Sequence, residues 1–196
     1  MKINEITVVM IYQSEIPDLQ IIRSDTNGYA ITRNGRTLLI DCPQTGMHFD
    51  KHHFNPPEVI LHTHVQKEHC MEWQSFPDTE VYVPAGTADI ARRADRFFKD
   101  CSTVWPEDRS WDTRGNEKYG VAGAVTERPP EKPLHVKGEL KPGRKFTWQD
   151  IELEIIVLPG HGKRSIGLYW KKHNVLFSGD LIRLSLIHIS EPTRPY

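Results

Sequence analysis

The sequence predicts one α/β (α+β) domain in which helices cover a β-sheet. Between residues 58 and 99, β-branched strand-like runs alternate with helix-like segments, which is the order expected for such a sheet. The 196 residues, 38% of them hydrophobic, suffice for one globular domain with its own core. No internal repeat or low-complexity segment divides the chain.

The expected strands are runs rich in β-branched and aromatic residues that end at turn residues. Asn34-Gly35 is a strong hairpin signal, and it joins expected strands at residues 29–32 and 37–41. A helix is expected to begin near residue 68, and Thr87 is expected to cap another that continues to about Lys99. The other expected strands cover residues 6–12, 19–23, 59–61, 80–83, 145–148, 151–158, 165–170 and 174–178. Residues 101–142 show little periodicity.

Composition excludes several classes of protein. A formal charge of -1 gives no electrostatic reason to expect binding to nucleic acid or to an anionic membrane. No apolar run approaches the roughly 20 residues that a membrane-spanning helix needs. Three widely spaced cysteines argue against a disulfide framework, so we expect a cytoplasmic protein.

Polar side chains crowd the short turn where the expected strand 59–61 gives way to a helix. The turn carries possible metal ligands at His62, His64, Gln66, Glu68 and His69. Nitrogen and oxygen donors gathered so densely at one turn are typical of a metal site. His62 and His64 lie on the same face of an extended chain. The alternative interpretation is a solvated histidine-rich loop.

Two later segments place further ligand types at strand ends. His161 follows a strand and a Pro-Gly turn, and Gly160 and Gly162 on either side allow close approach of the backbone to a bound group. Asp180 ends a strand directly after Gly179. Strand ends on one side of a sheet are where α/β folds assemble their sites.

These segments together resemble the metallo-β-lactamase superfamily. Residues 63–69 resemble its Thr-His-x-His-x-Asp-His motif, with Gln66 in place of the second His and Glu68 in place of the Asp. Residues 158–167 resemble its Pro-Gly-His segment, and residues 175–180 its strand ending in Gly-Asp. Residues 27–29 and 39–41 resemble its opening hairpin. The resemblance covers roughly residues 5 to 182.

The resemblance implies an αββα sandwich, of which this chain holds the N-terminal portion, and one or two divalent metal ions. Zinc is the first expectation, with iron or manganese as alternatives. The implied metal ligands are His64, Gln66, Glu68, His69, His161 and Asp180. Asp41 would hold the ligands in place without binding the metal itself, or it would simply cap a turn. In an alternative register, His62 and His64 form the His-x-His pair, and His69 is the third ligand.

The implied function is that of a metal-dependent hydrolase. A metal-activated water would attack an ester, thioester, lactam or phosphodiester of a small-molecule substrate, with Glu68 and Asp180 as catalytic residues. Gln66 and Glu68 depart from the family pattern, which motivates a second hypothesis of a non-catalytic binding member. A third is a mononuclear iron oxidoreductase, because two histidines and a carboxylate suit iron. Oligomeric state stays open.

The last residues are expected not to belong to the domain. Residues 184–196 resemble the translation of a sequencing adapter, so we treat them as a non-native tail. The family-like domain would then occupy residues 1–183 and be incomplete at its C-terminus.

Overall fold

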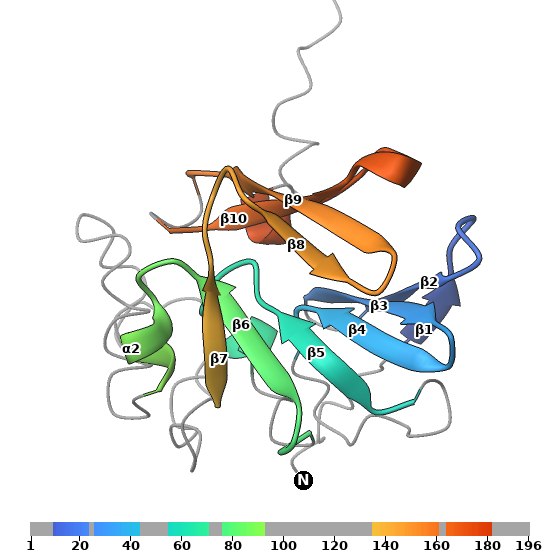
Figure 1. Ribbon diagram of the computed structural model, residues 1–196, viewed down its shortest axis with the longest axis horizontal. Coiled ribbons are helices and arrows are strands. Elements are labelled where there is room, and N and C mark those ends of the chain that lie inside the picture. Colours follow the sequence, from blue (N-terminus) through green and yellow to red (C-terminus); the bar gives the residue numbers. More distant parts are fainter. Residues whose placement is uncertain are drawn as a thin grey trace, which may run out of the picture.

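The computed structural model describes residues 10–23, 26–43, 55–70, 76–92, 135–160 and 164–181. Within these residues a seven-stranded sheet has the strand order β1-β2-β3-β4-β5-β6-β7 (Figure 1). Its first four strands pair antiparallel, and β4 to β7 pair parallel. The strands are β1 (Met10–Gln13), β2 (Leu19–Arg23), β3 (Asn27–Arg33), β4 (Arg36–Ile40), β5 (Pro57–Leu61), β6 (Glu80–Pro84) and β7 (Val136–Leu140).

A second, antiparallel sheet faces the first and has the order β11-β10-β9-β8. Its strands are β8 (Lys145–Trp148), β9 (Ile151–Val157), β10 (Ile166–Trp170) and β11 (Val175–Phe177). The short 3-10 helix η3 (Lys171–His173) joins β10 to β11, and η4 (Gly179–Leu181) follows β11. The chain therefore passes from one sheet to the other at the turn between β7 and β8.

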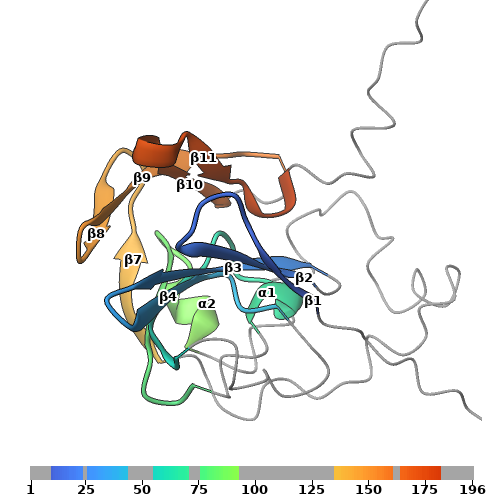
Figure 2. The same ribbon diagram turned by 90° about the vertical axis from the view of Figure 1, so that its right-hand side faces the viewer.

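Two layers of apolar side chains hold the structure together. One fills the space between the sheets, where Leu38, Leu61, Leu168 and Trp170 are almost fully buried. The other packs the opposite face of the large sheet, through residues such as Leu39 and Ile60, against the helical side. Figure 2 shows α1 (Lys67–Cys70) and α2 (Ala88–Ala91) on that side. Two facing sheets, with helices on the outer face of the large one, agree with the predicted sandwich.

Most expected elements in the described residues are confirmed. The hairpin turns at Asn34 and Gly35, which have φ values of 52° and 73° and so match the turn that Asn-Gly favours. Strands β2 and β8 have the expected bounds, whereas β7 lies in the segment that showed little periodicity. Thr87 occupies the expected N-cap position of the helix at Ala88–Ala91, but its Oγ1 donates to the Pro84 carbonyl oxygen (2.6 Å) and makes no capping hydrogen bond.

Other expectations fall outside the described residues. Residues 6–9, the helix beyond Arg92 and residues 184–196 are among them, so the non-native tail stays a prediction. Within the described part of the chain, no helix is both long enough and apolar enough to cross a membrane.

Polar contacts tie the sheets together at the hairpin end of β4. Trp148 Nε1 donates to Glu58 Oε2 (3.1 Å), and Asn34 Nδ2 donates to Gln149 Oε1 (2.9 Å). Asn34 belongs to the turn that precedes β4, whereas Asp41 directly follows the other end of that strand. These contacts between the sheets therefore lie at the opposite end of β4 from Asp41.

Candidate metal centre

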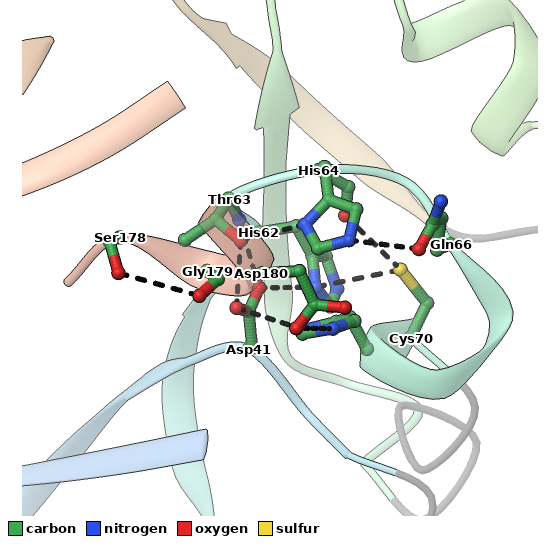
Figure 3. A network of polar contacts seen from close by, with 10 residues as sticks. Asp41, His62, Thr63, His64, Gln66, Cys70, Ser178, Gly179 and Asp180 are labelled. Atoms are coloured by element: carbon green, nitrogen blue, oxygen red, sulfur yellow. Dashed lines mark hydrogen bonds and ion pairs between the residues drawn. The ribbon is translucent and has the colours of Figure 1, made fainter. Parts of the chain in front are cut away.

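The cluster begins where the parallel strands β4 and β5 end side by side. Asp41 directly follows β4, and His62, Thr63 and His64 directly follow β5. The Asp41 amide donates to the Leu61 carbonyl oxygen (2.9 Å), which continues the pairing beyond the strands. The Cys42 amide donates to the His69 carbonyl oxygen (2.8 Å) and so holds α1 against the same edge. Figure 3 shows the side chains that meet there.

The second sheet supplies Asp180. The Ile166 amide donates to the Thr63 carbonyl oxygen (2.9 Å) and thereby fixes β10 beside the turn that follows β5. Gly179 has a φ of 54° and lies so close to Thr63 that a Cβ atom would collide with the threonine Oγ1. Glycine is therefore required for this close approach, which brings Asp180 to the cluster.

Asp41 organises the turn from a fully buried position. Its Oδ1 accepts from the Thr63 amide (2.8 Å), and its Oδ2 accepts from Thr63 Oγ1 (2.8 Å). The same Oδ2 lies 3.1 Å from His69 Nδ1. Asp41 has a φ of 56°, which is uncommon for a residue with a side chain and is often found at functional sites.

This network determines which nitrogen of His64 carries a proton. The single Thr63 hydroxyl proton goes to Asp41, so Oγ1 must accept from His64 Nδ1, which lies 3.0 Å away. The neutral His64 ring then has a lone pair on Nε2. That nitrogen lies 3.1 Å from Gln66 Oε1, which is also an acceptor. Two acceptors at this distance repel unless a proton or a cation lies between them.

His69 and Asp180 form a second close pair of potential metal ligands. His69 Nδ1 faces Asp41, and its Nε2 lies 3.2 Å from Asp180 Oδ1. This nitrogen is buried. The His64 and His69 rings are adjacent, with centroids 4.1 Å apart.

The arrangement fits a divalent cation. Two ligands bound about 2.0–2.1 Å from one ion lie roughly 3.0–3.4 Å from each other, and the His64–Gln66 and His69–Asp180 pairs have such separations. Asp41, His64 and His69 also have potential ligand atoms within 4.8 Å of one another. Because both Asp41 oxygens already accept hydrogen bonds, however, Asp41 is better placed to hold His69 than to bind an ion.

The structure brings together six of the eight residues singled out from the sequence: Asp41, His62, His64, Gln66, His69 and Asp180. His62 is the outlier among them. Its Nδ1 lies 3.7 Å from Asp41 Oδ1 and 3.6 Å from Cys70 Sγ, and it is not one of the three residues whose ligand atoms converge. The side chain of Glu68 and all of His161 lie outside the described residues, so their roles stay predictions.

Two neighbours of the cluster were not identified from the sequence. Thr63 connects Asp41 to His64 through its hydroxyl, as described above. The sequence did contain a signal for Thr63, because it lies directly before the first motif histidine. That position was used only to align the family motif on His64. Tyr29 is the other neighbour. The pKa of its hydroxyl is raised mainly by burial and further by the negative charges of Asp41 and Asp180.

Strong electrostatic coupling follows from burying these groups together. Burial opposes ionisation of Asp41, but the charge of His69 and contacts with His62 and His69 hold the Asp41 pKa well below its ordinary value. Burial also opposes protonation of His69, yet the charge of Asp41 and the contact with Asp180 raise its pKa to about 10. Without metal, His69 is therefore an imidazolium between two carboxylates.

The metal-free protein is expected to lose stability as the pH rises above neutrality. Because the folded pKa of His69, about 10, exceeds the unfolded value of about 6.5, its contribution is complete below pH 6.5 and disappears as the pH approaches 10. The free energy of unfolding should fall by about 1 kcal/mol per pH unit between pH 7 and 9. Urea unfolding in the presence of EDTA measures this slope. A His69→Asn variant with the same slope as the unmodified chain would contradict the expectation.

Comparison with known proteins places this chain in a family. The sequence profile described as the metallo-beta-lactamase superfamily matches residues 22–192. Acyl-coenzyme A thioesterase MBLAC2 of Gallus gallus is 29% identical over 126 residues, which are 64% of this chain and 42% of that protein. The chain thus aligns with about two fifths of the length of this relative.

Solved structures share the fold at low sequence identity. The metallo-β-lactamase BJP-1 of Bradyrhizobium japonicum has a TM-score of 0.57 at 15% identity, over 88% of this chain and 62% of that one. The superfamily protein ST1585 of Sulfolobus tokodaii has a TM-score of 0.56 at 16% identity, with the same coverages. The profile match spans most of the sequence. The chain therefore belongs to the metallo-beta-lactamase superfamily.

Proposed function

We propose that this chain carries the metal centre of a hydrolase that cleaves acyl thioesters. The observation that carries the proposal is two close pairs of potential ligand atoms, His64 Nε2 with Gln66 Oε1 and His69 Nε2 with Asp180 Oδ1, at separations of 3.1 and 3.2 Å that suit ligands of a bound cation. The thioester assignment is supported by the similarity to the avian acyl-coenzyme A thioesterase. Glu68 and His161 are proposed as further ligands from the sequence.

A bound divalent cation would supply a water of lowered pKa and a Lewis acid for the substrate carbonyl group. The described residues would orient the proposed ligands for this chemistry. Asp41 and Thr63 fix the proton of His64 on Nδ1 and so direct a lone pair on Nε2 into the cluster. Asp41 also orients His69 through Nδ1.

Asp180 is the described carboxylate best placed to orient the attacking water and accept its proton. It is 8% exposed, whereas Asp41 is completely buried, so Asp180 lies nearer the solvent side of the cluster. Both oxygens of Asp41 accept hydrogen bonds from the turn. We therefore propose a catalytic role for Asp180 and a supporting role for Asp41.

Metal analysis combined with a substrate panel tests the proposal. The purified chain is loaded with zinc, manganese or iron, dialysed, analysed for metal, and then assayed with an acyl-CoA thioester, an aryl ester, a β-lactam and a phosphodiester. We expect about one metal ion per chain and thioester hydrolysis that EDTA abolishes and added metal restores. Less than about 0.2 metal ion per chain would contradict the metal centre.

The same experiment separates the alternative functions. Metal binding without hydrolysis of any substrate would favour a non-catalytic binding member of the family. Selective retention of iron, together with oxygen consumption, would favour an oxidoreductase. Hydrolysis of another substrate in preference to the thioester would retain the hydrolase and change its substrate class.

A further inference from the structure

The Gln66 side chain gives the proposed centre an unusual balance of donors. Among the described residues, the two close pairs of potential ligand atoms consist of two imidazole nitrogens, from His64 and His69, and two oxygens, from Gln66 and Asp180. Imidazole favours zinc and other late first-row metals, whereas amide and carboxylate oxygens favour manganese and magnesium. Half of this donor set therefore suits harder metals.

The position of Gln66 is built into the turn. It lies two residues after His64, and the His69 amide donates to its carbonyl oxygen (3.1 Å), which starts the helical turn of α1. Its side-chain oxygen faces His64 Nε2 at 3.1 Å, as Figure 3 shows. The network from Asp41 through Thr63 places a lone pair on that nitrogen when the ring is neutral, and a bound cation would then be shared by this nitrogen and the carbonyl oxygen that faces it.

From this geometry we infer that Gln66 binds the metal through its amide oxygen and shifts the selectivity of the centre from zinc toward manganese or iron(II). This inference rests on the proposed function and adds the class of metal. An amide oxygen is a weaker ligand for zinc than an imidazole nitrogen, while manganese distinguishes the two ligands much less. Selectivity should therefore depend on residue 66.

The test compares zinc and manganese affinities of the unmodified chain and a Gln66→His variant. Each metal-free protein is titrated at one pH in competition with a fluorescent chelator, and Mn²⁺ binding is also followed by electron paramagnetic resonance. Gln66→His is expected to raise zinc affinity by about 10- to 100-fold and to change manganese affinity by less than about threefold. The ratio of the two affinities is the quantity that decides the question.

A matched variant controls for an added imidazole. Gln149→His places a histidine at the turn between β8 and β9, where Gln149 contacts Asn34 at the other end of β4 from the cluster. It should leave both affinities unchanged. Because Gln66 is half-buried, the variants are expected to fold, which circular dichroism and thermal unfolding verify.

The outcomes distinguish this inference from the proposed function. If metals bind but Gln66→His leaves the zinc-to-manganese ratio unchanged, Gln66 does not set selectivity and the hydrolase proposal stands. If the ratio changes equally in Gln149→His, the added histidine acts nonspecifically and the inference is wrong. If neither metal binds the unmodified chain or Gln66→His, both proposals fail.

Discussion

Replacing His69 with alanine is expected to lower zinc affinity by at least about 100-fold. The substitution removes the nitrogen that lies 3.2 Å from Asp180 Oδ1, and with it one of the proposed metal ligands. It also leaves Asp41 and Asp180 without the ring that separates their charges. The loss should therefore exceed what removal of a single peripheral contact would cause. Competition titration of the metal-free protein with a chelator of known affinity measures the change.

An exposed histidine provides the matched control for this experiment. His135 lies directly before β7 and is solvent-exposed, so His135→Ala should leave zinc affinity unchanged. Should His69→Ala unfold the chain, His69→Gln keeps much of the side-chain volume and offers an amide oxygen. In the folded variant, cobalt(II) absorption reports whether the ligand set has changed. Equal zinc affinities of the His69 and His135 variants would show that the site has been misassigned.

Local signals were sufficient for much of the fold. Asn34-Gly35 specifies its own hairpin, because both residues readily adopt the positive φ values that the turn needs. In strand β5 the run Val59–Leu61 is apolar and buried on both faces, which is typical of a parallel strand between two layers. By contrast, β7 reads Val-Lys-Gly-Glu-Leu and has no continuous apolar run. It forms because β6 provides a parallel partner, which is tertiary information that no local pattern contains.

The site shows the same division between local and distant information. His64, Gln66 and His69 occur within six residues, so their closeness follows from one turn between a strand and a helix. The pairing of His69 with Asp180 depends on the docking of the second sheet, which the Ile166 amide and the contact of Gly179 with Thr63 establish. The hydrogen bonds that connect Asp41 through Thr63 to His64 depend on side-chain rotamers and hydrogen positions. The resemblance to the family could identify the residues, but it could not identify the hydrogen bonds that connect them.

Replacing Asp41 with asparagine is expected to destabilise the protein by about 3–5 kcal/mol. The fully buried carboxylate accepts from Thr63 and faces His69, so its removal leaves a buried imidazolium short of one counter-charge. Asparagine tolerates the positive φ at this position, so the backbone should not add to the cost. Urea unfolding at pH 7 in the presence of EDTA measures the change.

The Asp41 variant also tests the role assigned to this residue, because a supporting residue and a ligand differ in their effect on metal binding. If Asp41 orients His69 and fixes the proton of His64, Asp41→Asn should weaken zinc binding by about 10- to 100-fold and leave the number of bound ions unchanged. Asp18→Asn is the matched control. Asp18 is 36% exposed and pairs with Arg33 at the surface, so its loss should cost no more than about 1 kcal/mol. If Asp41→Asn cost no more than Asp18→Asn and left zinc affinity unchanged, the buried network would have no part in shaping the centre.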